Sequence, residues 1–563
     1  MDTSNRISAA QKDLIMDVAS GALYAYLKDG SKPDCSAVEV GRFDGLQMTV
    51  RHRGMPVISA TGEGETAADQ LSNAIYNLCA DVTCGGLTSF HVDGLNVEVW
   101  IRICSELVAV ELRDSDRSLT GGSFGVEVQW NDARAHFDPS VILARQFKSP
   151  AELLNGLCLF SGLFQEAWRE TYCIVRKVHW IHLCRDQLGN SVELFALRTV
   201  APDRLSKDDL RSLVSQGASF LINNQNAGGD YCYIYQALEG KGHQRKQNLV
   251  RASGCAYAMT TSARVVSPEL SPRVISSSRR AILAVLRRTE KWGDDGLIVR
   301  EDDAEVIWGK LGSGALAAVA MLELDDPVFH PDALKALLLA LKGAQRANGL
   351  FDCFYGIDRS PDSVINYYPG EALLALAISG SKGDADALEC CRRAFLPYRQ
   401  HFRNAPSSAF VGWHVDVWSR LARVLHDGEY ISFVFEQLDW LLAFQCREGD
   451  NVGGFAFDDK PPGVSSTVYT EATIRGAALA HALGLQDRCH TYAKAGRFGL
   501  LFCARLQLNA SSSGILPNPQ RALGGVTGNL RTFQVRADNV QHMMTMAQTA
   551  LELSTGWSEL LYS

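Results

Sequence analysis

Long apolar runs and an excess of positive charge are both missing from this sequence of 563 residues. A helix that crosses a bilayer needs about 20 mostly apolar residues in succession, and nonspecific nucleic-acid binding needs a basic field. Here 63 acidic side chains face 55 basic ones, which gives a formal net charge of −8. Residues 1–6 also lack the basic and apolar regions of a signal peptide. We therefore expect a cytoplasmic protein that binds neither membranes nor nucleic acid.

A regular cysteine spacing is missing as well. The fifteen cysteines are odd in number, and several lie inside apolar segments, as Cys158 and Cys255 do. This placement is typical of buried thiols in a reducing compartment. Asp538 and His542 are one helical turn apart and could supply two zinc ligands, but no cysteine is placed to be the third. We expect neither a metal nor another cofactor.

Residues 7–184 alternate between helical and extended patterns, which predicts an α+β domain. Helical patterns cover residues 9–27 and 67–79, and a further helix that begins at Ser149 stops at Gly162 and restarts. The strand patterns are residues 38–43, 45–51, 97–103 and 125–130. A polar linker at residues 185–205 follows, with a possible strand at 192–200. Ser206, with Asp209 three residues later, then predicts a helix start.

The N-terminal part resembles the AMMECR1 domain family. The resemblance rests on Ala25-Tyr-Leu-Lys28, residues 46–50, Phe124-Gly-Val-Glu-Val128 and above all Leu153-Leu-Asn-Gly-Leu-Cys158, with Gly162 and Ala167-Trp168. The family's loop Leu-Arg-Gly-Cys-Ile-Gly should fall near residues 52–64, where this chain has no cysteine. The role of that loop is therefore not carried over. The resemblance implies a fold, and a domain that binds or assembles with a protein partner rather than one that catalyses a reaction.

From residue 206 to residue 563 one unit recurs six times. Amphipathic helices end near Gln225, Thr289, Gln345, Gln400, Gln445 and Gln507, at intervals of 45 to 64 residues. The endings at Thr289 and Gln400 are weaker than the other four. Each interval fits two helices and two connections, and such pairs must stack to bury their apolar faces. Six pairs predict a closed (α/α)6 toroid.

The second helix of each pair begins with polar and aromatic residues, at Asn248, Trp308, Asn366, Gly412, Tyr469 and Arg536. Their bodies are small and apolar, as an inner ring requires. All six inner helices of a toroid start at the same end. The charged residues near these starts should therefore converge on one mouth: Arg251, Glu371, His414, Asp416, Glu471, Arg475, Arg536, Asp538 and His542.

This pattern resembles the six-hairpin group of carbohydrate-active enzymes, chiefly through Asn248-Leu-Val-Arg251 and Tyr367-Tyr-Pro-Gly-Glu371. The resemblance implies a glycosidase, epimerase or lyase acting on a small sugar or an oligosaccharide. The candidate catalytic residues are Glu371, His414, Glu471, Asp538 and His542. The candidate substrate-binding residues are Tyr231, Tyr233, Arg251, Trp308, Tyr367, Tyr368, Trp413, Arg475, Arg536 and Asn539. Arg251, Arg475 and Arg536 together predict an anionic substrate such as a uronic acid.

Several alternatives stay open. A weaker resemblance, through Gly453-Gly-Phe-Ala-Phe457 and residues 537–542, is to prenyltransferases and terpenoid cyclases, although an aspartate-rich diphosphate motif is missing. A toroid without catalysis, used as a scaffold, is a third hypothesis. Glu471 and Arg475 are spaced for a simple ion pair. His414 and Asp416 are two apart and face different sides of a helix, and we favour His414 for the funnel.

Overall fold

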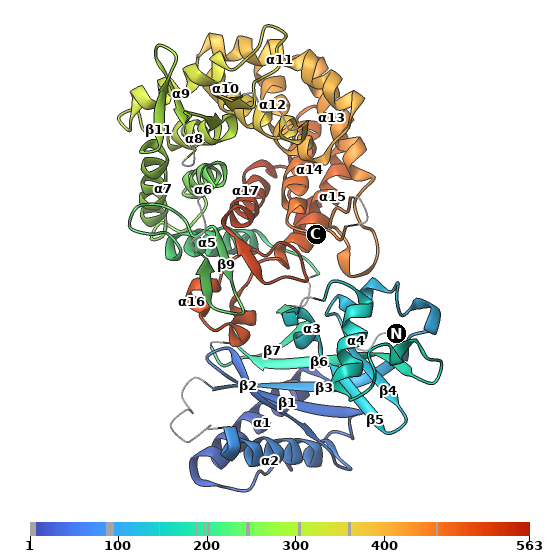
Figure 1. Ribbon diagram of the computed structural model, residues 1–563. Helices are drawn as coiled ribbons and strands as arrows, with labels where there is room; N and C mark the ends of the chain where they lie inside the picture. Colours follow the sequence, from blue (N-terminus) through green and yellow to red (C-terminus); the bar gives the residue numbers. More distant parts are fainter. Residues whose placement is uncertain are drawn as a thin grey trace.

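The computed structural model describes residues 7–562 except 86–94, 146, 187, 196, 200–202, 244–247, 302–305, 358–361 and 458–459. Figure 1 shows two parts: an N-terminal domain with a sheet, and a larger helical domain above it. Among the described residues, no helix has both the length and the apolar character that a bilayer crossing needs.

The N-terminal domain is built on an antiparallel sheet in the order β2-β1-β3-β6-β4-β5, with β7 beside β6 and β8 beside β7. The strands are β1 (Gly45–His52), β2 (Met55–Gly62), β3 (Leu95–Leu107), β4 (Gly125–Trp130), β5 (Ala133–Phe137), β6 (Ile174–Arg185), β7 (Ser191–Phe195) and β8 (Arg198–Thr199). The helices are α1 (Ala9–Asp29), α2 (Ala67–Gly85), α3 (Pro139–Arg145) and α4 (Pro150–Phe160). α1 and α2 cover β1 and β3, and their buried faces form one core.

One expectation for this domain was wrong, and two others were confirmed in part. Residues 38–43 form no strand, because Val38 and Phe43 are buried in the core while the backbone of Phe43 pairs with the side chain of Gln70. The helix that begins after Ser149 ends at Phe160, and Gly162 has a φ of 78°. It restarts only as the short 3-10 turn Ala167–Arg169. Residues 191–199, within the expected linker, pair with the sheet as β7 and β8, and residues 187, 196 and 200–202 of that linker lie outside the described residues.

The helical domain is a ring of six helix pairs. The outer helices are α5 (Lys207–Asn223), α7 (Ser271–Leu286), α9 (Pro331–Gly343), α11 (Ala385–Asn404), α13 (Gly428–Leu442) and α15 (Gln486–Ala504). The inner helices are α6 (Leu249–Ser262), α8 (Leu311–Leu324), α10 (Tyr368–Ser381), α12 (Ser408–Leu425), α14 (Ser465–Ala482) and α17 (Ala537–Leu553). Each inner helix contacts the next, and α17 returns to contact α6, so the ring is closed (Figure 1). The predicted helix start at Ser206 is present as a capping box with Asp209.

A recurring glutamine explains the repeat. Gln345 Nε2, just after α9, donates to Gly349 O of its own turn (3.0 Å) and to Cys390 O of α11 (2.8 Å). Gln225 and Gln445 make the same two kinds of bond. Gln507 donates to Leu213 O of α5, which links the last outer helix to the first. The weaker two positions lack this bond, because Thr289 begins a short strand and Gln400 lies inside α11.

Candidate functional site

A cavity of about 390 Å³ lies where the inner helices begin. Its lining comes from the first turns of five of them and includes Asn248, Arg251, Tyr367, Tyr368, Glu371, Ser408, Trp413, Ser465, Tyr469, Arg536, Asp538, Asn539 and His542. Helix N-termini carry partial positive charge, so several of them aimed at one cavity favour an anionic ligand. The first turns of these inner helices thus meet at one mouth, as the repeat predicts.

Asp538 is the fixed negative charge of the cavity. Arg536 Nε donates to its Oδ1 (2.9 Å), a second guanidinium nitrogen of Arg536 contacts Oδ2, and Arg251 Nε lies 3.3 Å from Oδ2. Burial alone would raise the pKa of Asp538, but the hydrogen bonds from Arg536 and the charge of Arg251 outweigh it and lower that pKa. The carboxylate stays ionised and is engaged by two cations.

The carboxyl group of Glu371 differs from that of Asp538, because its pKa is raised. Its side chain is 3% exposed, and Oε2 has no hydrogen-bond partner among the described residues. Burial raises its pKa from the ordinary value of 4.5 to about 7, although the charge of Arg251 opposes the rise. A Cβ at Gly312 of α8 would lie 2.0 Å from Oε2, so the neighbouring helix needs glycine there. Glu371 is thus a carboxyl group that gains and loses its proton near neutral pH.

His542 supplies a neutral imidazole. Burial lowers its pKa to about 4, Arg251 adds to the effect, and Asp538 opposes it. Gln541 Nε2 lies 3.3 Å from Nδ1. An amide nitrogen can only donate, so Nδ1 is the acceptor and the neutral ring carries its proton on Nε2. His542 therefore offers an N–H donor at neutral pH.

Aromatic faces form much of the remaining wall. Tyr367, which is 40% exposed, lines the cavity with Tyr368, Trp413 and Tyr469. The Tyr469 hydroxyl donates to Ser408 Oγ (2.9 Å). Burial raises the pKa of Tyr368 to about 12, and Glu371 adds to the rise. Burial also raises the pKa of Tyr469, so Tyr368 and Tyr469 stay protonated at neutral pH.

Three predicted aromatic binding residues lie outside the cavity lining, and the amide of a fourth predicted residue, Asn539, is already engaged. Tyr231 is buried in the core, with its hydroxyl 3.3 Å from Ser277 Oγ. Trp308 packs beside Phe354 outside the cavity lining. Tyr233 also lies outside the lining, and the Arg536 guanidinium sits over its ring at 5.7 Å. Asn539 does line the cavity, but its amide donates to Val526 O (3.1 Å), which is a structural bond.

The structure places neither His414 nor Asp416 in the cavity lining. His414 is fully buried and stacks on Phe410 with ring centroids 3.5 Å apart, away from the cavity. Burial holds its pKa well below the ordinary value. Asp416 is also buried, and it pairs with Arg420 (2.7 Å) and Arg475 (3.0 Å). The two positions are about 200° apart around a helix, so only one can face inwards.

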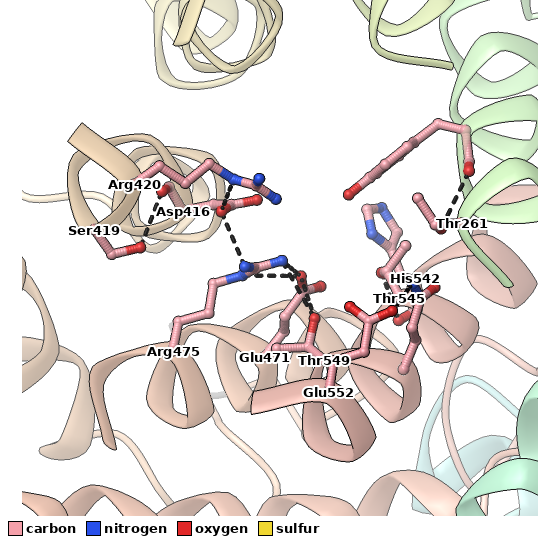
Figure 2. Close-up of polar contacts among 12 residues, drawn as sticks. Thr261, Asp416, Ser419, Arg420, Glu471, Arg475, His542, Thr545, Thr549 and Glu552 are labelled. Atoms are coloured by element: carbon pink, nitrogen blue, oxygen red, sulfur yellow. Dashed lines mark hydrogen bonds and ion pairs between the residues drawn. The ribbon is translucent and has the colours of Figure 1, made fainter. Parts of the chain in front are cut away.

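Glu471 and Arg475 lie deeper in the ring and outside this cavity. Figure 2 shows Arg475 of α14 reaching Asp416 of α12 (3.0 Å) and Glu471 (2.7 Å). Thr549 of α17 donates to the same Glu471 oxygen (3.1 Å), and Arg420 Nε donates to Asp416 (2.7 Å). The network ties three inner helices together. A second cavity of about 150 Å³, lined partly by Arg420 and Arg475, lies towards the C-terminal ends of those helices.

Sequence reasoning missed two hydroxyl groups, Ser408 and Ser465, which line the cavity from the first residues of α12 and α14. The reason is that both helices begin four residues before the starts expected at Gly412 and Tyr469. Serine at a helix start is itself a usable signal. Within the part of the chain that the structure describes, no three His, Cys, Asp or Glu side chains form a metal-binding group.

No protein-family model matches the sequence, and no curated protein matches it either. Among solved structures, a D-mannose isomerase is 12% identical over 62% of this chain and 98% of its own, with a TM-score of 0.47. A GH76 alpha-mannanase of Bacteroides thetaiotaomicron is 11% identical over 60% of this chain and 95% of its own, with a TM-score of 0.42. An uncharacterized protein from Pyrococcus horikoshii is 18% identical over 34% of this chain and 99% of its own, with a TM-score of 0.29.

Proposed function

We propose that the toroid is an enzyme that moves a proton at a carbon next to the carbonyl group of an acidic sugar, as an epimerase, isomerase or lyase does. The observation that carries the proposal is the pairing of two groups in one aromatic-walled cavity. Glu371 has a pKa of about 7, and His542 is neutral. A group with a pKa near the working pH is best suited to general acid–base catalysis.

The wall of the cavity fits a sugar. Binding pockets combine apolar and aromatic faces with a few placed polar groups. Here Tyr367 and Trp413 offer the faces, and the hydroxyls of Ser408 and Ser465 offer hydrogen bonds. A volume of about 390 Å³ fits one or two sugar rings better than a long polymer.

Charge favours an acidic sugar over a neutral one. Arg251 and Arg536 bring two positive charges, and Asp538 neutralises one of them. With Glu371 protonated, one net positive charge is left, and with Glu371 ionised the formal charges cancel. The helix N-termini add positive potential in both states. A guanidinium group binds a carboxylate through paired hydrogen bonds. Arg475, the third arginine of the sequence-based prediction, is not part of this argument because Asp416 and Glu471 engage it.

The two groups take complementary roles. In an isomerisation, ionised Glu371 removes the proton from the carbon next to the carbonyl and returns it to the carbonyl carbon. The proton of the neighbouring hydroxyl group passes to the former carbonyl oxygen, so that the protons balance. The Nε2–H of His542 donates to the carbonyl oxygen while negative charge develops there. A neutral imidazole serves this purpose because it keeps its proton throughout.

Hydrolysis of a glycosidic bond fits the cavity less well. That reaction needs two carboxyl groups, one as acid and one free to attack or to activate water. Asp538 is held by two guanidinium groups and its pKa is lowered, so it is a weak base. For the N-terminal part, an AMMECR1-like accessory domain that binds a protein partner stays a proposal.

Proton NMR in D2O tests the proposal. The full chain is incubated with D-glucuronate, D-galacturonate, D-glucose and D-mannose, and loss of the signal from the hydrogen next to the carbonyl is followed. We expect deuterium to enter an acidic sugar with the natural chain and not with Glu371→Gln. Glu389→Gln, at an exposed position of α11, is the matched control and should keep the exchange.

Exchange that persists in Glu371→Gln would remove Glu371 from the mechanism. Thermal shifts with the same four sugars separate binding from catalysis, because a ligand that binds only the folded state raises the melting temperature. If no sugar shifts the melting temperature and none exchanges, the proposal is wrong and a scaffold role is favoured.

A further inference from the structure

A cleft of about 860 Å³ lies between the two domains, away from the toroid mouth. Its N-terminal side comes from the 3-10 turn Arg117–Thr120, from α3 and from the residues that lead into α4. Its other side is the toroid segment that contains Asn529, Arg531 and Thr532. No residue of this lining belongs to the toroid-mouth cavity, so the cleft is a separate site.

Three cations face the cleft, namely Arg117, Lys148 and Arg531. None of their side chains forms an ion pair with a described residue. Only Asp114 is acidic among the described lining residues, and Arg169 already engages it at 2.6 Å. Burial lowers the pKa of Arg531, and the positive charge of Arg117 lowers it further. Arg117 and Lys148 are exposed, whereas Arg531 is partly buried close to Arg117. A positive charge partly withdrawn from water beside a like charge costs free energy, and a bound anion would reduce that cost.

The start of α4 adds to the positive field. Ser149 caps the helix, Pro150 occupies its first turn, and both residues line the cleft. The helix runs for 11 residues, so its N-terminal end carries partial positive charge. The Glu152 carboxylate, which accepts from Lys148 N (2.7 Å), offsets part of that charge. The cations and the helix end thus border the same cleft.

Apolar side chains also line the cleft. They are Ile142, Leu143, Phe147 and Pro150, and the Phe147 ring stacks on Phe137 at a centroid distance of 5.9 Å. An inorganic ion alone would leave these side chains in contact with water. A ligand with both an anionic group and a flat or apolar part would contact both kinds of lining residue.

We infer that this cleft binds a small phosphorylated molecule, with the phosphate group held by Arg117, Lys148 and Arg531 and an aromatic ring laid against Phe147. A nucleoside monophosphate has this chemistry. Phosphate is favoured over a single carboxylate because three cations converge and guanidinium groups bind phosphate oxygens in pairs. Because the lining comes from both domains, the bound molecule contacts both.

Isothermal titration calorimetry of the full chain with AMP, and separately with inorganic phosphate, tests the inference. We expect both to bind and AMP to bind more tightly. The double variant Arg117→Gln, Arg531→Gln should weaken both by at least roughly tenfold, since two charge-assisted contacts are lost. Phe147→Ala should remove most of the advantage of AMP over phosphate and leave phosphate binding intact.

Two controls locate the binding. Arg273→Gln, at an exposed position of α7, should change nothing. Arg251→Gln tests the toroid mouth, which is also positively charged, and should leave AMP binding unchanged. Weakening by Arg251→Gln but not by the double variant would place the phosphate in the toroid mouth and overturn the inference. Absence of binding for both AMP and phosphate would overturn it as well, provided that circular dichroism shows a folded chain.

Discussion

Replacing Glu371 with glutamine should stabilise the protein, and the gain should grow with pH. Burial raises the pKa of Glu371 from 4.5 to about 7. Each pKa unit corresponds to about 1.36 kcal/mol, so the folded state loses about 3 kcal/mol when this carboxyl group ionises. The side chain is 3% exposed, so solvent screening does not reduce the figure appreciably.

The sign follows from the protonated forms. Below pH 4.5 the carboxyl group is neutral in both the folded and the unfolded chain, and it adds nothing to the pH dependence of stability. Between pH 4.5 and 7 the unfolded chain releases its proton while the folded chain keeps it, so stability falls. Above pH 7 the loss is complete. The advantage of Glu371→Gln should therefore rise through this window and level off at about 3 kcal/mol.

Urea unfolding followed by tryptophan fluorescence at pH 4.5, 5.5, 6.5, 7.5 and 8.5 measures this advantage. Any effect of the glutamine amide on stability that does not depend on pH cancels, because only the change with pH of the difference in unfolding free energy is used. Glu389→Gln, whose carboxyl group is 58% exposed, is the control and should give a flat difference. A flat difference for Glu371→Gln, or one that falls with pH, would refute the buried, unpaired carboxyl group on which the proposed function rests.

Two further substitutions test the packing around the site and the repeat. Gly312→Ala should abolish proton exchange with sugars, because its Cβ would lie 2.0 Å from Glu371 Oε2. Gly314→Ala is the control and should retain the exchange, because its Cβ would meet only a Leu337 methyl at 3.6 Å. Equal activities of the two variants would contradict the role of Gly312 in making room for Glu371. Gln345→Leu should cost about 2 to 3 kcal/mol in urea unfolding, because two carbonyl groups lose their donor. Gln400 is exposed and lies inside α11, so Gln400→Leu should cost under about 0.5 kcal/mol. If the two substitutions cost the same, the bond from Gln345 to the neighbouring helix is not formed.

The residues at the toroid mouth could be predicted, because their position depends only on the repeat length and on the alternation of outer and inner helices. Six helix pairs place every second helix inside, and all inner helices start at one end, so residues in a first turn must meet. Glu371 and Asp538 lie three and one residues after the first residues of α10 and α17. At about 1.5 Å per residue, both stay at the level of the cavity.

How far the other candidate site residues lie below the toroid mouth could not be predicted, because helix starts are the least certain part of a sequence-based assignment. α12 begins at Ser408 and α14 at Ser465, each four residues earlier than expected. Asp416 and Glu471 therefore lie about 12 and 9 Å along their helices, below the mouth. An error of one helical turn moved a candidate catalytic residue into an ion-pair network. Which side of α12 faces inwards was equally open, because His414 and Asp416 both suit a buried position.

The way in which the two domains join was also not visible in the sequence, and Arg198 supplies several of the hydrogen bonds that join them. Arg198 of β8 is 4% exposed and reaches into the toroid. Its guanidinium group donates to Thr527 Oγ1 (2.9 Å), to Thr532 O (2.6 Å) and to Leu530 O (3.2 Å). Burial lowers its pKa to about 9, and Arg505 adds to that shift.

Replacing Arg198 with methionine should therefore cost about 3 kcal/mol or more, since the carbonyl groups that it satisfies would be left without a donor. Arg198→Lys should recover little, because an ammonium group lacks the planar fork that spans these acceptors. Urea unfolding measures both, and Arg211→Met, at an exposed position of α5, is the control. The segment that Arg198 holds also carries Arg531 and Thr532 into the interdomain cleft. Arg198→Met should thus weaken AMP binding as well as stability, and a variant that loses neither would show that this contact does not join the domains.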